Sequence, residues 1–227
     1  LNVEGAKMSK SLGNVLSPGD MVAEFGLDQL RYFLLREVPY GSDGSFSREQ
    51  IISRINSDLA NDLGNLAQRV LSMVQRYCEG RVPSPDVLND DDHTLLDNSQ
   101  DLIRSVRPHM ENLAFHTALE NIWTIIRSAN AYVDHQAPWQ LRKDDPLRMA
   151  TVLFVLTEAI RNIALLLQPF MPQSMDALLA QLAIADQAQK QFEFHGPKGQ
   201  IQPGTELPKP EGIFPRFVEE ETAKTGA

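Results

Sequence analysis

Between residues 47 and 80, apolar side chains recur every three or four positions, the spacing of one face of an α-helix. Ser47 and Gln50 have the spacing of a capping box, and Gly80 is a typical stop. Such a helix would be about 50 Å long and cannot bury its apolar face alone, so other helices must pack against it. The stripe consists of Ile51, Ile55, Leu59, Leu63, Leu66, Val70 and Val74.

Most of the remaining chain has the same helical period, with short interruptions. Prolines mark several ends, namely Pro108, Pro138, Pro146, Pro169 and Pro172. Consecutive helices with short connections predict an antiparallel bundle, so we expect an all-α fold. The further helices are expected at residues 20–25, 28–37, 93–107, 111–135, 146–167 and 173–184, with a Pro-containing acidic linker at 81–92.

Three segments differ in character. Residues 1–46 hold a glycine-flanked loop and two short helices, and residues 47–185 hold the long helix and the rest of the bundle. Residues 186–227 lose the helical period and are rich in Pro and Gly, which predicts an extended tail over the bundle. Gly64 lies inside the long helix, where it costs about 1 kcal/mol relative to Ala, so we expect another backbone to pack closely there.

Composition narrows the class of protein. The net charge of −9 argues against indiscriminate nucleic-acid binding, although it leaves room for a local basic patch. A single cysteine excludes an internal disulfide framework, and apolar runs such as 163–167 are far too short to span a bilayer. With no signal peptide at its start, we expect the chain to act in the cytoplasm, away from membranes.

The segment with the clearest chemistry is the glycine-flanked loop, which carries Lys7 and Lys10. Two ammonium groups on a mobile loop can meet a polyphosphate and stabilise the charge that develops on departing pyrophosphate. Closure and opening of the loop could follow ATP binding and product release. An exposed lysine loop without a function has the same spacing, and the two lysines alone favour that simpler interpretation.

Residues 7–11, Lys7-Met8-Ser9-Lys10-Ser11, reproduce the KMSKS signature of class I aminoacyl-tRNA synthetases, and the flanking residues 5–14 match as well. The segments 26–47 and 54–69 resemble those that follow the signature in methionyl-tRNA synthetases. The "FPRF" run at 214–217 resembles the end of the short bacterial form of that family. The resemblance covers almost the whole chain and is closest over residues 5–69.

The resemblance implies ATP-dependent activation of methionine, with Mg²⁺, followed by transfer to the 3′ end of tRNA(Met). Lys7 and Lys10 would be catalytic, and all five residues from Lys7 to Ser11 would bind ATP. No HIGH motif is present, so we expect this chain to be the C-terminal portion of a larger enzyme and to be inactive alone. The N-terminal catalytic part, with its methionine pocket, would be its partner. One cysteine and scattered histidines exclude a tetrahedral zinc site, so no metal site is expected.

Two places in the bundle could contact unstacked bases. Asn61, Asn65 and Arg69 form a polar line along the long helix, and amides and guanidinium groups suit base edges. Trp139 follows a helix end and could stack on a base. From spacing alone, the asparagines fit a helix–helix contact better, and Trp139 fits the end of a core equally well.

The family resemblance favours recognition of the anticodon. In methionyl-tRNA synthetases an Asn and an Arg on the first long bundle helix and a Trp in an "APW" context read the CAU anticodon, and these positions match Asn65, Arg69 and Trp139. Arginines on or just past the long helix, namely Arg54, Arg69, Arg76 and Arg81, could meet backbone phosphates. Asn61 and Pro138 match the surrounding pattern.

Two other classes of protein remain open. A sibling class I synthetase for Leu, Ile, Val or Cys shares the loop and a helical bundle, but would prefer tRNAs unrelated to CAU. A stand-alone helical tRNA-binding or scaffold module would have no active site for the loop to serve. The short C-terminus indicates a monomer.

Overall fold

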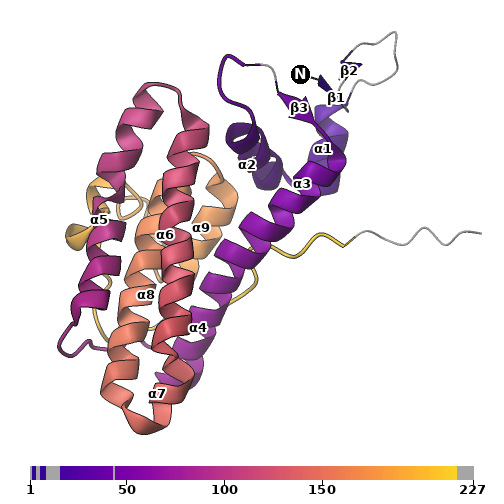
Figure 1. Cartoon of the computed structure of the whole chain (residues 1–227). Coiled ribbons are helices and arrows are strands. Elements are labelled where there is room, and N and C mark those ends of the chain that lie inside the picture. The colour runs from indigo at the N-terminus through magenta and orange to yellow at the C-terminus, as the bar shows by residue number, and fades with distance from the viewer. Residues whose placement is uncertain (1, 4–5, 9–15, 43, 219–227) are drawn as a thin grey trace, which may run out of the picture.

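The computed structural model describes residues 2–3, 6–8, 16–42 and 44–218. Helices α5, α6 and α8 stand side by side next to a long rod made by α3 and α4, with α1 and α2 beside the upper end of the rod (Figure 1). The α-helices are α1 (Pro18–Phe25), α2 (Leu27–Glu37), α3 (Arg48–Arg54), α4 (Asn65–Tyr77), α5 (Asp90–Glu111), α6 (Phe115–Gln136), α7 (Pro138–Asp144), α8 (Pro146–Leu167) and α9 (Pro172–Gln181). The predicted all-α bundle is confirmed.

The N-terminal segment adds a small sheet that the sequence did not predict. β1 (Asn2–Val3) pairs antiparallel with β2 (Ala6–Lys7) and parallel with β3 (Ser45–Phe46). The two expected short helices follow, and the Ser17 side chain caps α1 by accepting from the Asp20 amide at 3.4 Å. The sheet therefore ties the start of the signature segment to the residues that lead into α3.

The predicted long helix is continuous, but its geometry is not uniform. Between α3 and α4 lies η2 (Ile55–Gly64), a π-helix of 10 residues, and at its end the Asn65 amide donates to Ala60 five residues earlier. All seven members of the predicted apolar stripe are buried, at 2% exposure or less. A π-helix turns less per residue than an α-helix, so it changes the direction in which α4 presents its side chains.

Gly64 ends the π-helix and lies under the C-terminal tail. A Cβ atom there would lie 2.9 Å from the Leu59 carbonyl oxygen and 3.6 Å from the carbonyl oxygen of Phe214. Another backbone thus passes close to this glycine, as the sequence predicted. The tighter restriction comes from the π-helix itself, since Leu59 is five residues earlier in the same helix.

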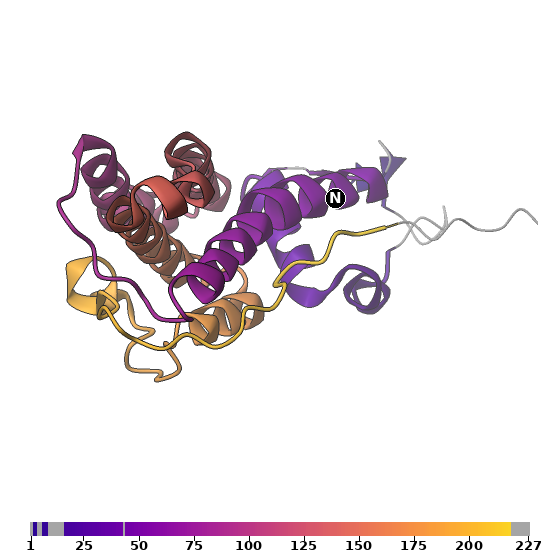
Figure 2. The ribbon, with the colours of Figure 1, turned by 90° about the horizontal axis from the view of Figure 1, so that it is seen from below.

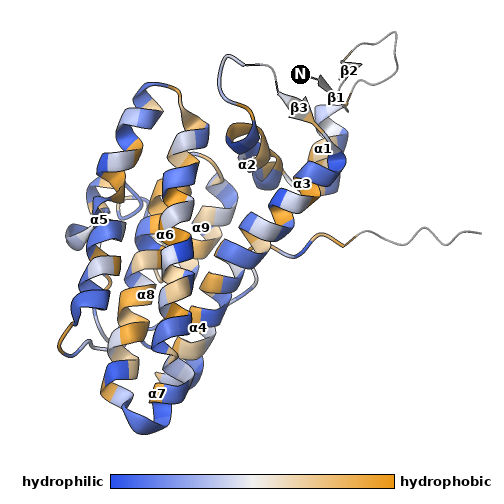
Figure 3. Ribbon diagram, in the orientation of Figure 1, coloured by the Kyte–Doolittle hydropathy of each residue, from blue (hydrophilic) through white to orange (hydrophobic). Residues whose placement is uncertain are grey.

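Helix α8 is the centre of the bundle. Its sequence is long and apolar enough to cross a membrane, but 94% of its most apolar window is buried inside the protein. The outer faces of α5 and α6 are hydrophilic, whereas their inner faces are apolar (Figure 3). Burial in the core therefore accounts for the apolar composition of α8.

Two predicted helix boundaries were wrong. Pro108 lies inside α5, which continues to Glu111, and Pro138 starts a helix, α7, that the sequence did not predict. Pro is tolerated in a first helical turn, where its missing amide has no partner to lose. The predicted linker is also shorter, because a capping box between Asn89 and Asp92 starts α5 inside the acidic run.

The tail runs beneath the bundle and back toward α1, as Figure 2 shows. It contains two short 3₁₀ helices, Phe192–Phe194 and Pro197–Gly199, and is otherwise irregular or extended. A buried ion pair on α8 holds it, because Arg161 bonds Glu158 at 2.9 Å and donates to the Phe194 and Gly196 carbonyls at 2.7 Å. The Glu158 carboxylate in turn accepts from the Ile201 amide at 2.8 Å. The predicted tail therefore packs on the bundle through its core helix.

Candidate nucleic-acid interface

Arg69 and Trp139 meet at one end of the bundle. Arg69 lies on α4, and its Cζ atom is 4.7 Å from the centroid of the Trp139 ring. Trp139 is 39% exposed, so part of the ring faces solvent. The structure thus brings together two of the three residues predicted to read an anticodon, in a cation–π stack.

The turn between α6 and α7 sets the position of Trp139. Ala137 adopts a left-handed conformation with φ 44°, and the buried Pro138 then starts α7. A tight turn of this kind fixes the direction of the second helix. Trp139 is consequently held at a helix start and not on a long loop.

A buried polar network fixes the last turns of α6, which precede that turn. The Arg148 guanidinium donates to both carboxylate oxygens of Asp92, at 2.5 and 2.8 Å, and to the Gln136 side chain at 2.7 Å. Tyr132 donates to the same carboxylate. Burial alone would raise the pKa of Asp92, but the hydrogen bonds from Arg148 and Tyr132 lower it, so the carboxylate stays charged and keeps the network together.

A carboxylate on α6 holds Arg69 from the other side. The Asp134 carboxylate accepts from the Arg69 guanidinium at 2.6 Å. Arg69 is therefore held between an acid and an aromatic ring, with 29% of its side chain exposed. This arrangement limits its rotamers and leaves one edge available to a ligand.

Asn65 lies one helical turn before Arg69, and its side chain is exposed. Asn61, one turn earlier still, is engaged by the tail, because its side-chain oxygen accepts from Arg216 at 3.0 Å. The structure therefore separates the polar line that the sequence predicted. Arg69 contacts Trp139, Asn65 is exposed one turn before it, and Asn61 is joined to the tail.

The arginines proposed to meet phosphates also differ from one another. Arg54 is half-buried and bonds Glu37 at 2.9 Å and Asp58 at 3.2 Å, so it joins α3 to neighbouring elements. Arg81 bonds Glu206 at 3.0 Å, whereas Arg76 is exposed. Of these, Arg69 and Arg76 lie on α4 itself, toward the Trp139 end.

A second cation–π stack lies beside the first and was missed from the sequence. Arg142 of α7 lies over the ring of Tyr77 at the end of α4, with its Cζ atom 4.8 Å from the centroid. The two stacks are reciprocal, since each helix supplies one arginine and one aromatic ring. In the sequence, Arg142 is one of two neighbouring basic residues, and their place in the last turn of a helix is clear only from the structure.

The signature loop is described only in part. Lys7 ends β2, while Ser9, Lys10 and Ser11 lie outside the described residues. Met8 lines an apolar cavity of about 130 Å³ together with Leu16, Met21 and Phe46. The methionine of the signature thus lies against apolar residues of α1, α2 and β3.

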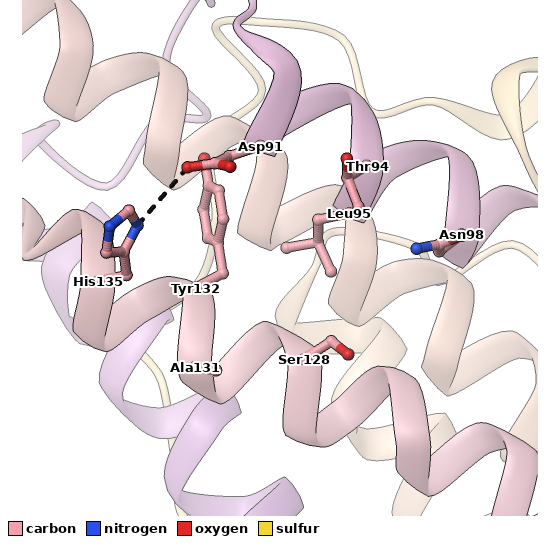
Figure 4. A pocket seen from close by; sticks show the side chains of 8 residues that line it. All are labelled: Asp91, Thr94, Leu95, Asn98, Ser128, Ala131, Tyr132 and His135. Atoms are coloured by element: carbon pink, nitrogen blue, oxygen red, sulfur yellow. Dashed lines mark ion pairs between the residues drawn. The ribbon is translucent and has the colours of Figure 1, made fainter.

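A groove of about 260 Å³ runs between α5 and α6. Figure 4 shows Asp91 and His135 on its two walls, with His135 Nδ1 3.5 Å from the Asp91 carboxylate. Thr94, Asn98 and Ser128 also line the groove. None of the residues that line it is a lysine or an arginine, so it does not extend the candidate interface. Over the described part of the chain, no cluster of three His, Cys, Asp or Glu side chains could hold a metal ion.

Two family sequence models match the chain. The one described as "tRNA synthetases class I (M)" covers residues 1–71, and the one for the anticodon binding domain of methionyl tRNA ligase covers residues 82–226. The helical bundle and the signature segment therefore define part of a class I aminoacyl-tRNA synthetase. More narrowly, the chain belongs to the methionyl-tRNA synthetase family.

Individual relatives agree with this assignment. The chain is 49% identical over 216 residues to a methionine–tRNA ligase of Brucella suis, and 48% identical over 221 residues to one of Mycobacterium tuberculosis. These matches cover 95% and 96% of the chain but only 41% and 42% of the relatives.

A solved structure of the M. tuberculosis methionyl-tRNA synthetase in complex with methionyl-adenylate matches with a TM-score of 0.89 at 47% identity. The match covers 94% of this chain and 43% of that one. The chain thus spans about two-fifths of the length of these relatives.

Proposed function

We propose that this chain supplies the signature loop and the anticodon-recognition bundle of a methionine–tRNA ligase that acts in the cytoplasm. The observation that carries the proposal is the match of residues 82–226 to the anticodon-binding domain, combined with the Arg69–Trp139 stack at an exposed end of that bundle. The whole enzyme would form methionyl-adenylate from methionine and ATP and transfer the methionyl group to tRNA(Met).

In the anticodon step, Trp139 offers the exposed part of its ring as a stacking platform for one unpaired base. Asn65 and Arg69 offer an amide and a guanidinium to the edges of neighbouring bases. Because Asp134 and Trp139 already hold Arg69, its donors are oriented before RNA arrives, which reduces the entropy lost on binding.

In the adenylation step, the methionine carboxylate attacks the α-phosphorus of ATP, and the bond to pyrophosphate breaks. Lys7 and Lys10 stabilise the negative charge that develops on the pyrophosphate, while Ser9 and Ser11 shape the loop or donate to phosphate. ATP would bring Mg²⁺ on its phosphates. The methionine pocket belongs to the catalytic part, and we infer the functional division 1–46, 47–185 and 186–227 and a monomeric enzyme.

Binding of anticodon stem-loop RNAs to the 227-residue chain tests the anticodon function. We expect a CAU stem-loop to bind at least tenfold more tightly than the same hairpin with the anticodon permuted to UAC. Equal affinity for both hairpins would favour a sibling synthetase or a general RNA-binding module instead.

The catalytic division is tested by methionine-dependent exchange of pyrophosphate into ATP. We expect no exchange with this chain alone, and measurable exchange would contradict the division. In the whole enzyme, Lys10→Ala should slow adenylation far more than it weakens methionine binding, and equal losses would argue against a role at the leaving group.

A further inference from the structure

Arg127 is an arginine on the candidate interface that the proposed function does not use. It lies on α6, seven residues before Asp134, and α6 residues at that spacing share one face. Asp134 holds Arg69, so Arg127 faces the same neighbouring helix about two turns away. Its partner there is Asp62 of the π-helix.

A backbone contact places Arg127 relative to Asn65. The Asn130 side chain, on the turn after Arg127, donates to the Asp62 carbonyl at 3.0 Å and joins α6 to the π-helix. Asp62 lies one turn before Asn65, and Arg69 lies one turn after it. Along the helix, the exposed Asn65 therefore lies between Asp62, which pairs with Arg127, and Arg69, which pairs with Asp134.

The two arginines are held with different strength. The Arg69–Asp134 distance is 2.6 Å, whereas Arg127 Nε is 3.7 Å from the nearer Asp62 oxygen, too far for a hydrogen bond. Arg127 is 54% exposed, and an exposed ion pair contributes only about 0–1 kcal/mol. Arg127 can therefore leave Asp62 and pair with another anion at little cost in free energy.

The Asp62 carboxylate approaches Arg127 without a hydrogen bond and also lies near a second carboxylate, that of Asp58. Burial, followed by the nearby charge of Asp58, raises the pKa of the Asp62 carboxyl, although Arg127 acts in the opposite direction. A phosphate is a stronger partner, because it can accept two parallel N–H bonds from one guanidinium.

We propose that Arg127 binds a backbone phosphate of the anticodon loop, next to the base that Asn65 reads. On this proposal, which rests on the proposed function, Arg127 leaves Asp62 when RNA binds. It contributes affinity and register without sequence preference, since a phosphate contact carries no base information.

The test is the salt dependence of binding, with the CAU stem-loop as probe. Neutralising one phosphate contact in a single-stranded loop contributes about 0.7 to the slope of log K against log[salt]. We expect Arg127→Gln to reduce the slope by about that amount and to weaken CAU and UAC hairpins by the same factor. Arg127→Lys keeps the charge and should restore the slope.

Arg104→Gln is the matched control, because Arg104 is 81% exposed, pairs with Asp101 and lies on α5, on the far side of α6 from α4 (Figure 1). It makes the same charge change and should leave the slope unaltered. An unchanged slope for Arg127→Gln, or an equal fall for Arg104→Gln, would overturn the proposal. Failure of the proposed function has a different signature, namely no preference of the unaltered chain for CAU over UAC.

Discussion

The guanidinium of Arg69 lies over the ring of Trp139, 4.7 Å from its centroid, although the two residues come from different helices and are separated by 70 positions (139 minus 69). The Asp134 carboxylate accepts a hydrogen bond from the same guanidinium. Arg69 is therefore already held by an aromatic ring and a carboxylate in the free chain.

Substitutions at Arg69 and Trp139 should be coupled. Trp139→Ala removes a stacking platform, which costs about 1–3 kcal/mol per base and weakens the CAU stem-loop roughly tenfold to a hundredfold. Since Arg69 loses its stacking partner in the same variant, adding Arg69→Gln should cost less than it does alone. A double-mutant cycle measured by RNA titration checks this, and strict additivity would show that the stack does not orient Arg69.

Gly64→Ala should destabilise the chain, even though Ala is normally better by about 1 kcal/mol inside a helix. The added Cβ would lie 2.9 Å from the Leu59 carbonyl oxygen, and such crowding costs about 1–3 kcal/mol. Gly212→Ala is the control, because nothing lies within 4 Å of its Cβ position. The free energies of unfolding in urea should fall for the first variant only, and a gain at Gly64 would argue against the π-helical geometry.

Glu158→Gln should release the tail. The change leaves the Arg161 charge buried without its partner, and breaking a buried pair in this way costs about 3–5 kcal/mol. Limited proteolysis should then cut within residues 192–201, while urea unfolding reports the loss of stability. Glu193→Gln, in an exposed pair with Lys198, should change stability by no more than about 0.5 kcal/mol. Equal protease resistance of all three proteins would mean that the ion pair does not hold the tail.

The chain should lose stability in mild acid through His195. Burial, with the nearby Arg161 charge, lowers the pKa of His195 from 6.5 to about 4. The unfolded chain therefore binds a proton at a higher pH than the folded chain, so stability from this group is complete above pH 6.5 and falls as the pH drops toward 4. Between pH 7 and pH 5 the loss is about 2 kcal/mol.

His195→Gln isolates that contribution, because the carboxylates titrate alike in both proteins. The difference in unfolding free energy between the variant and the unaltered chain should shift by about 2 kcal/mol between pH 7 and pH 5. A difference that does not depend on pH would show that the pKa of His195 is the same in the folded and the unfolded chain.

Local sequence patterns predicted most of the helices. The stripe from Ile51 to Val74 is buried as expected, and α8 has the predicted bounds. The errors arise where local signals have two meanings. Proline both breaks a helix and starts one, so Pro138 did not reveal α7, and Pro108 was accommodated within α5.

The candidate site was only partly predictable. The residue types and the family resemblance selected Asn65, Arg69 and Trp139, and these three stay predictions until RNA binding is measured. The bracing of Arg69 by Asp134 depends on the packing of α4 against α6, and no local pattern encodes a contact between residues so far apart. The π-helix was hidden as well, because its apolar residues keep a spacing that an α-helix also allows.

The last described residues of the tail lie against α1. Phe217 packs on Phe25 with ring centroids 5.3 Å apart, and Asn56 bonds the Phe217 backbone in both directions at 2.8 and 3.0 Å. Val218, the next residue, is exposed, whereas Trp139 lies at the start of α7, at the other end of the rod from α1 (Figure 1). A fluorophore, affinity handle or surface tether attached at this position would thus leave the Trp139 end unobstructed, and a chain immobilised there would present that end to the solution.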